Sequence, residues 1–282
     1  PKEILAQNTK ISHSGGAVYR FYNLTLPAYK GLFYDEKEHK FKIITICSNA
    51  HSCPFECYAR QGGYVMFPKT YLKSAKIINY IMNNWEGFKS ELLYEIERRE
   101  RLDARRNLIT VIRWHDSGDV IDNEYLEMAN DIARRTPNVI HYAYTKNVSM
   151  VMASDVPDNF VFNFSFGGKE DSKIPTSIKK HAIIVPRHYF ETIGRTVGTG
   201  KNKKFIYNNR ESINTLKDLL VARWEIPKDT IITYADLMKI PYNSHEKHEL
   251  KWNVIVAPGD GDDSAMRKDV RGTYLFKHGV KK

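Results

Sequence analysis

The stretch LITVIRWHDSGD, residues 108–119, joins a short apolar run to a polar turn. Residues 108–114 are rich in β-branched side chains and favour a strand, whereas the Ser, Gly and Asp that follow favour a turn. Runs of the same kind recur along the chain and predict six short strands in all. The other five are FKIITI (41–46), VIHYAYT (139–145), FVFNFSF (160–166), AIIVP (182–186) and WNVIVAP (252–258).

Segments with helical spacing of apolar residues separate these strands, and they cover residues 70–88, 90–103, 122–137 and 212–226. Strands that alternate with helices predict an α/β fold with a parallel sheet and right-handed crossovers. We expect the six strands to form a six-stranded parallel sheet that curls into a partial (β/α)6 barrel of the TIM type. A doubly wound sheet is the alternative, and periodicity does not distinguish the two.

The organisation of the chain follows from where the strands begin. Residues 1–40 are expected to form an N-terminal strand or hairpin extension, with a turn at Pro27, and residues 41–282 the barrel core. A long insertion is expected at about residues 187–251, before the last strand. The first residues lack the apolar segment of a secretory signal, and no run of about 18 apolar residues occurs. We therefore expect a cytoplasmic protein without a membrane span.

The charge balance of the chain is basic. Its 282 residues include 43 Lys and Arg but only 33 Asp and Glu, which gives a formal net charge of +10. Such a balance favours acidic partners, and nucleic acid is the first of these. The basic residues gather in RRERLDARR (98–106) and KNKK (201–204). For residues 98–106, a solvated helix face with interleaved acids is an equally supported interpretation.

The three cysteines of the chain, Cys47, Cys53 and Cys57, all lie in ITICSNAHSCPFECYARQGG (44–63). An odd number of thiols in a cytoplasmic chain argues against a disulfide framework and favours a metal or cluster. A [4Fe-4S] cluster held by three cysteines leaves one iron open to a small molecule, and this is the favoured interpretation. Structural zinc, with His51 as a fourth ligand, and unligated thiols are the alternatives.

Polar residues follow most of the predicted strands. The carboxyl ends of parallel strands meet at one edge of a sheet, and functional residues gather there in folds of this kind. Ordinary polar loops are the alternative explanation, because loops begin where strands end. The residues concerned are Cys47, the HDSGD turn (115–119), Thr145–Lys146, Asn163–Ser165 and Arg187.

The motifs CPFECYA, RWHDSGD, YAYTK and FNFSFG together resemble a bacteriophage family catalogued as gene product 88, over about residues 40–170. The three-cysteine loop also resembles that of the radical S-adenosylmethionine (SAM) enzymes. This resemblance implies a [4Fe-4S] cluster on Cys47, Cys53 and Cys57, with Tyr58 as the aromatic residue beside the third cysteine. The Cys-x5-Cys-x3-Cys spacing is longer in both gaps than the common Cys-x3-Cys-x2-Cys.

In radical SAM enzymes a Gly-Gly-Glu-like segment after the second strand holds the methionyl amine. The matching segment here is Ser117, Gly118 and Asp119, in which an Asp replaces the usual Glu. The resemblance therefore implies that these three residues, together with Tyr58 and Asn163, bind the cofactor SAM.

The expected catalytic residues are His115, Asp116 and Lys146, and Arg187 is expected to line the same cavity. A structural histidine and a backbone-capping aspartate are the alternatives for His115 and Asp116. The activity that the resemblance implies is reductive cleavage of SAM, with an electron donor as partner and a substrate that the sequence does not identify. The rival interpretation is a basic phage protein of the host cytoplasm that binds nucleic acid and holds a structural metal.

Overall fold

The computed structural model describes residues 3–7, 18–60, 63–174, 181–185, 194–198, 204–207, 210–243, 249–255 and 262–276. The chain divides into two compact units, Pro1–Ile174 and Pro175–Lys282. Arg187, Lys201 and Lys203 lie outside the described residues. No helix within the described ranges is both long enough and apolar enough to cross a membrane.

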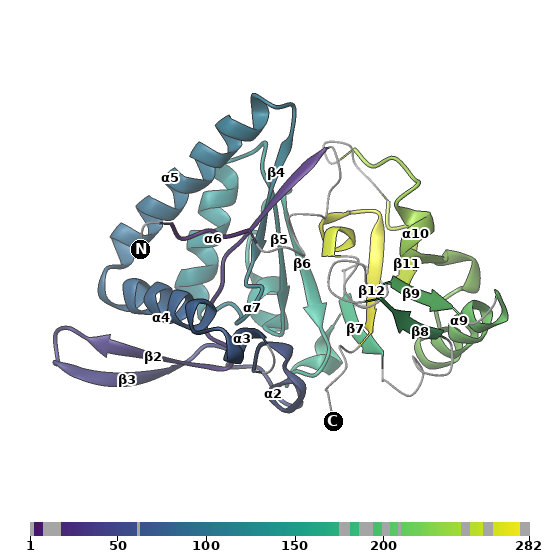
Figure 1. Ribbon diagram of the computed structural model, residues 1–282, viewed down its shortest axis with the longest axis horizontal. Helices are drawn as coiled ribbons and strands as arrows, with labels where there is room; N and C mark the ends of the chain where they lie inside the picture. The colour runs from purple at the N-terminus through teal and green to yellow at the C-terminus, as the bar shows by residue number, and fades with distance from the viewer. Residues whose placement is uncertain are drawn as a thin grey trace. The chain divides into compact units, whose positions relative to one another are not determined.

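The first unit is built on a parallel sheet of four strands in the order β1-β4-β5-β6 (Figure 1). The strands are β1 (Tyr19–Asn23), β4 (Ile109–Trp114), β5 (Ile140–Thr145) and β6 (Phe160–Ser165). The structure thus confirms a mixed α/β fold with a parallel sheet, and it confirms the strands predicted around residues 108–114, 139–145 and 160–166. The sheet has four strands in this unit rather than the predicted six.

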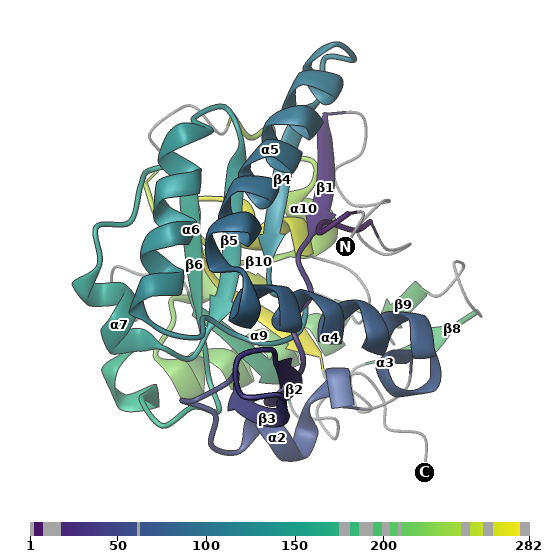
Figure 2. The same cartoon turned by 90° about the vertical axis from the view of Figure 1, so that its left-hand side faces the viewer.

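Helices cover one face of this sheet, and Figures 1 and 2 show α5 and α6 side by side on it. Apolar side chains from β4, β6 and these helices form the core between the two layers, and Trp114 stacks on Phe160 with ring centroids 5.7 Å apart. Burial of such side chains is the main source of stability for the unit. The helices are α4 (Pro68–Asn83), α5 (Trp85–Ala104), α6 (Asn123–Arg135) and α7 (Val148–Ala153).

Side-chain caps fix where the two long covering helices begin. The Asp122 carboxylate accepts the Tyr125 N–H at 2.8 Å and caps α6, which begins within the helix predicted from residue 122. The Asn84 side chain accepts the Gly87 N–H at 3.0 Å and caps α5. Helix α5 therefore begins at Trp85, before the residue 90 that the spacing of apolar residues predicts, because a side-chain cap satisfies the first free N–H groups there.

The predicted first strand of the parallel sheet lies elsewhere, and this prediction was wrong. Residues 41–46 fall in β3 (Lys40–Thr45), which pairs antiparallel with β2 (Lys30–Asp35) in a separate hairpin. The four residues between these strands form a turn, and a parallel pair would need a crossover of a dozen or more residues. Phe41 and Ile43 are exposed, so the apolar run marks a half-solvated hairpin strand rather than a buried one.

The strand that pairs with β4 is β1, within the segment predicted to be an N-terminal extension. Residues 4–6 lie against the same part of the unit, since Ala6 bridges to Asn23 and the buried Glu95 carboxylate accepts the Ile4 N–H at 2.8 Å. Residues before position 40 therefore contribute to the sheet and to its core, where Ile4 and Phe21 are fully buried.

The second unit also contains four parallel strands, in the order β7-β12-β11-β10. The strands expected at 182–186 and 252–258 correspond to β7 and β11. The C-terminal strand β12 has no counterpart in the sequence prediction. The elements are β7 (His181–Val185), β8 (Gly194–Val197), β9 (Lys204–Tyr207), α9 (Arg210–Trp224), β10 (Ile231–Thr233), α10 (Tyr234–Leu237), β11 (Trp252–Ile255) and β12 (Val270–Phe276).

A buried histidine in β5 is held in its neutral form by its two partners. His141 Nδ1 accepts the Trp114 indole N–H at 3.1 Å, and its Nε2 lies 2.9 Å from the Thr136 hydroxyl. That hydroxyl donates to the Ile132 carbonyl at 2.8 Å, so it accepts from Nε2–H. A second proton on Nδ1 would face the indole N–H. Burial lowers the pKa of His141 to about 3, and burial does the same for His115.

These two histidines predict a loss of stability in acid. The unfolded chain takes up protons at histidine below pH ~6.5, whereas the folded protein does so only near pH 3. The free energy of unfolding is therefore highest above pH ~6.5 and falls as the pH drops from there towards 3. Urea denaturation at several pH values measures this. His141→Gln should flatten the profile and exposed His39→Gln should not; equal profiles for His141→Gln and the unsubstituted protein would contradict it.

Candidate functional site

The HDSGD turn leaves the end of β4 with a strained backbone. His115 has a φ of +59° and Gly118 a φ of +89°, both in the left-handed region. A Cβ on Gly118 would lie 2.7 Å from Leu26 Cβ, so only glycine fits. The Leu26 N–H donates to the Ser117 carbonyl at 3.0 Å, which keeps the turn beside the segment that follows β1. The close approach that Gly118 allows is thus made by the chain itself.

Asp119, at the end of this turn, ties the end of β4 to the end of β5. Its Oδ1 accepts the Thr145 hydroxyl at 2.7 Å and the Val120 N–H at 2.7 Å, and its Oδ2 accepts the Lys146 N–H at 2.9 Å. Burial raises the pKa of Asp119, and the hydrogen bonds from Thr145 and Lys146 oppose that rise. Asp122 caps the next helix, so Asp119 does not have that capping role.

The thiol loop, residues 47–57, carries the three cysteines of the chain. Cys47 follows β3, Cys53 begins the short helix α2 (Cys53–Glu56), and Cys57 follows that helix. All three side chains are half-buried. Cys53 and Cys57 lie close enough for each thiol to shift the pKa of the other.

One backbone carbonyl after β6 holds the thiol loop in place. The Gly167 carbonyl accepts the N–H groups of His51 and Ser52 at 3.1 Å each and that of Cys53 at 3.3 Å. Gly167 has a φ of +97°, a conformation that favours glycine, and a Cβ there would lie 3.2 Å from Ser52 Oγ. The loop is therefore anchored at the carboxyl end of the sheet by backbone hydrogen bonds.

The Asp171 side chain stabilises this anchor through two hydrogen bonds. The Asp171 carboxylate accepts the Gly167 N–H at 2.9 Å and the Gly168 N–H at 2.8 Å. The Lys169 N–H donates to the Asn49 carbonyl at 2.8 Å, so the two loops continue to pair. Asp171 and Gly167 were not among the predicted site residues. A glycine pair followed closely by an acid was the available signal.

The three thiols do not ionise alike. The hydrogen bond from Cys57 lowers the pKa of Cys53, and Lys146 lowers it further. Donating that bond and being buried raise the pKa of Cys57. Burial, with the nearby Asp119 carboxylate, raises the pKa of Cys47 to about 12. The loop thus favours a thiolate at Cys53 first, and a bound metal ion would be needed to deprotonate all three.

The Lys146 side chain connects the end of β5 to the end of β6 and to the thiol loop. Its Nζ donates to Ser165 Oγ at 3.0 Å, to the Ser165 carbonyl at 3.4 Å and to the Phe166 carbonyl at 3.2 Å. Its positive charge also lies near the Cys53 thiol and lowers the pKa of that thiol. Lys146 is 8% exposed, so its charge is largely removed from water.

The structure brings some of the predicted site residues together and separates others. Asp119 bonds the Lys146 backbone, and both residues lie close enough to Cys47 and Cys53 to shift the pKa of these thiols. His115 points into the core, where its Nε2 lies 2.9 Å from the Tyr125 hydroxyl. Asp116 Oδ2 accepts from Asn23 Nδ2 at 2.8 Å and from the Tyr64 hydroxyl at 3.1 Å, towards β1.

Of the four remaining predicted site residues, two are buried and two have side chains outside the described part of the structure. Asn163 is buried within β6 and its Nδ2 donates to the Ala143 carbonyl at 3.3 Å. Ser117 is buried in the turn. Tyr58 begins a single turn of 3-10 helix, Tyr58–Arg60, and its side chain lies outside the described part of the structure, as does Arg187.

The donors present fit a metal or cluster in kind and number, because three thiols are soft ligands suited to iron–sulfur centres and zinc. The candidate fourth ligand for zinc, His51, is exposed on the same loop. Within the described residues, no three His, Cys, Asp or Glu side chains are arranged to hold a metal ion. The loop therefore supplies the ligand types without a closed coordination geometry.

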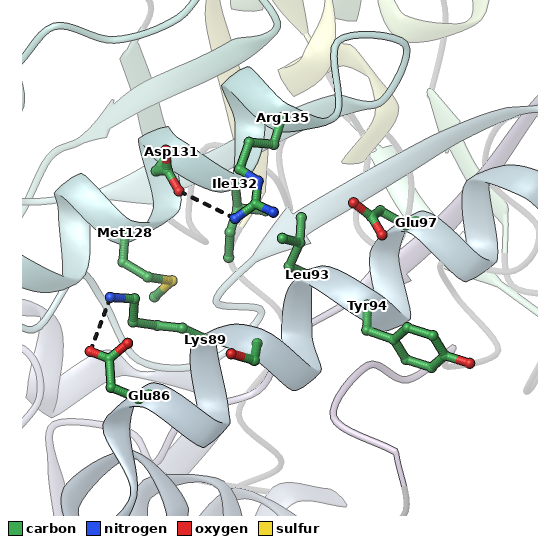
Figure 3. A pocket seen from close by; sticks show the side chains of 10 residues that line it. Glu86, Lys89, Leu93, Tyr94, Glu97, Met128, Asp131, Ile132 and Arg135 are labelled. Carbon is green, nitrogen blue, oxygen red and sulfur yellow. Dashed lines mark hydrogen bonds and ion pairs between the residues drawn. The ribbon is translucent and has the colours of Figure 1, made fainter.

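A groove of about 420 Å³ lies between α5 and α6 (Figure 3). Its charged side chains pair along each helix, with Lys89 Nζ 3.2 Å from Glu86 and Arg135 4.0 Å from Asp131. None of the predicted site residues lines it. It is lined by Glu86, Lys89, Ser90, Leu93, Tyr94, Glu97, Met128, Asp131, Ile132 and Arg135.

Comparison with known proteins gives one match. A family model described as Gene product 88 matches residues 3–229, which is more than half of the chain. No curated protein and no solved structure matches the chain.

Proposed function

We propose that this chain, which belongs to the gene product 88 family, is an iron–sulfur enzyme of the radical SAM type. Cys47, Cys53 and Cys57 would hold a [4Fe-4S] cluster, and an external electron donor would be its partner. When bound, such a cluster supplies the electron for reductive cleavage of SAM. The observation that carries the proposal is that the thiol loop, Asp119 and Lys146 meet at the carboxyl ends of β5 and β6.

The donor set supports iron–sulfur over zinc. Structural zinc sites are closed by four protein ligands, whereas three cysteines suffice for a cluster with one open iron. The chain has three cysteines, and the one histidine in the loop is exposed. The expected framework is the partial (β/α)6 barrel, which would enclose the sheet face that helices α5 and α6 do not cover.

Asp119 supports binding of the methionyl end of SAM. An ionised carboxylate has about four sites that accept hydrogen bonds, and the protein fills three of those on Asp119. The remaining site on Oδ2 would accept an ammonium group in a place that excludes water. The three protein hydrogen bonds would orient the carboxylate before the ligand arrives.

Anaerobic purification followed by iron, sulfide and zinc determination tests the proposal. We expect a brown protein with about four irons and four sulfides per chain, and binding of SAM that depends on the cluster. One zinc per chain, with no sulfide and no visible absorbance, would overturn it in favour of a structural metal.

We also propose a second, compatible function, binding of nucleic acid, which the net charge of +10 favours. In the basic stretch 98–106, Arg98 and Arg99 lie 3.6 Å and 3.0 Å from Glu3 and are partly neutralised. Arg101, Arg105 and Arg106, at the end of α5 and just beyond it, are exposed. Within residues 98–106, these three side chains are the candidates for phosphate contacts.

This function predicts weak binding of duplex DNA that falls steeply with salt. Each phosphate contact contributes about 0.9 to the slope of log affinity against log salt concentration, because bound counterions are released. The double variant Arg105→Gln, Arg106→Gln should lower the slope by up to about 1.8 in fluorescence anisotropy titrations. Ion-paired Arg98→Gln is the matched control and should change it less. No binding at low salt would refute the function.

A further inference from the structure

The β2–β3 hairpin presents an apolar face to solvent. The register pairs Leu32 with Ile43 and Tyr34 with Phe41, so these four side chains lie on one side of the hairpin and form what we call the hairpin face. Phe41 and Ile43 are each 69% exposed, Leu32 is 48% exposed and Tyr34 is 36% exposed. The Tyr34 and Phe41 rings meet edge to face with their centroids 5.3 Å apart, so the patch is continuous across the two strands.

The opposite side of the hairpin is fixed to α4, beside which it lies in Figures 1 and 2. The Tyr34 N–H donates to Asn79 Oδ1 at 2.8 Å, and Asn83 Nδ2 donates to the Tyr34 carbonyl at 2.7 Å. Phe33, which alternates to that side, is buried. The hairpin face is therefore held in place by the rest of the unit and points away from it.

The area of the hairpin face is large for an exposed apolar patch. The four exposed fractions correspond to about 400 Å² of side chain in water, and patches of that size on a monomer are often functional. Two such faces in contact would remove about 800 Å² of apolar surface from water. With their polar rims they reach roughly 1,000 Å², the lower limit for a specific interface between proteins.

Charged residues at the two ends of β2 complement each other. Lys30 begins the strand on the side of the hairpin face, and exposed Glu36 follows the strand at its other end, in the same alternation. Two further acids of the tip, Asp35 and Glu38, are paired with Lys42 within the hairpin. A second hairpin laid over the first with its strands reversed would bring Lys30 of each copy to Glu36 of the other.

We propose that the hairpin face is the contact surface of a homodimer, in which two hairpins pack face to face with their strands antiparallel. A two-fold axis makes such a contact self-complementary, and two apolar sheet faces commonly bury each other in this way. Parallel strands would instead place Lys30 against Lys30 and Glu36 against Glu36. An anionic lipid surface fits less well, because Glu36 would face it. The inference does not depend on the proposed iron–sulfur function.

Sedimentation velocity of the full chain, from about 1 to 100 μM with a thiol reductant present, tests the proposal. We expect a reversible dimer with a Kd of about 10 μM, because the interface is small. The double variant Phe41→Ser, Ile43→Ser should raise the Kd by at least about tenfold. Tyr94→Ser is the matched control, since it removes a 60% exposed aromatic side chain from α5, and its Kd should be unchanged.

Charge reversal tests the arrangement of the two copies. Lys30→Glu should weaken the dimer, and the double variant Lys30→Glu, Glu36→Lys should restore it; an unchanged Kd in Lys30→Glu would overturn the antiparallel packing. A monomer at every concentration would overturn the proposal, and so would a monomer that binds phosphatidylserine vesicles through the hairpin face. Should the double serine variant fail to fold, Ile43→Thr keeps a β-branched side chain, and an unweakened dimer in that variant would also overturn the proposal.

Discussion

Single replacement of Cys47, Cys53 or Cys57 by alanine is expected to reduce the iron content from about four per chain to near zero, because two thiolates rarely retain a cubane. Iron and sulfide determination after anaerobic reconstitution measures the loss.

Ser52→Ala is the control for this experiment. Ser52 lies in the same loop, is exposed, and donates to the Gly167 carbonyl only through its backbone, which the substitution keeps. Its iron content should equal that of the unsubstituted protein. A circular dichroism melt should show all four variants folded, because the thiols are half-buried and alanine leaves no buried polar group unpaired. Normal iron content in all three cysteine variants would contradict ligation by the loop.

Three strands of the first sheet could be predicted from the kind of side chain that they contain. Residues 108–114, 139–145 and 160–166 are apolar and β-branched or aromatic because both faces of the sheet are largely buried. The same signal failed at residues 41–46, where Phe41 and Ile43 are exposed on a hairpin. An apolar run alone does not show whether a strand is buried, and the short turn before it was the better guide.

The meeting of the thiol loop with Asp119 was predicted, but by an argument that holds only in part. Asp119 does leave a parallel strand at the carboxyl edge, whereas Cys47 follows β3, which is outside the parallel sheet. The loop reaches that edge because the Gly167 carbonyl binds its backbone. Hydrogen bonds between backbone groups leave little side-chain pattern, so the glycine pair followed by Asp171 was the only sign of this anchor in the sequence.

The sequence likewise did not predict that Lys146 contacts the end of β6, or that Asp116 and Asp119 bond different strands. Asp116 and Asp119 are three positions apart in one turn, yet the first bonds Asn23 on β1 and the second bonds Thr145 on β5. The left-handed residue Gly118 turns the chain between them. Spacing predicts proximity along the backbone, but the direction of each side chain depends on backbone angles that residue type specifies only at glycine.

Asp119→Asn is expected to weaken both the fold and the proposed ligand site. The amide can keep one oxygen for Thr145 and Val120, but its NH2 group would then face the Lys146 N–H, and two donors would be left without an acceptor. Unsatisfied buried donors predict a loss of roughly 2–4 kcal/mol in the free energy of unfolding. Loss of the charge predicts a further weakening of SAM binding, by roughly 1–3 kcal/mol, because a charge-assisted bond to the ammonium group is removed.

Thr145→Val separates these two effects, because it leaves the Asp119 carboxylate charged while it removes the hydroxyl that donates to Asp119 and accepts the Asn147 N–H at 3.0 Å. We expect it to lower the free energy of unfolding by roughly 2 kcal/mol in urea denaturation, since the buried Asn147 N–H loses its acceptor, and to leave SAM affinity nearly unchanged in titration calorimetry. Asp119→Asn should lower both. If SAM affinity falls equally in the two variants, the carboxylate acts only by holding the ends of β4 and β5 together. If Asp119→Asn binds SAM as the unsubstituted protein does, Asp119 does not contact the ligand, and other residues near the thiol loop must bind the methionyl amine.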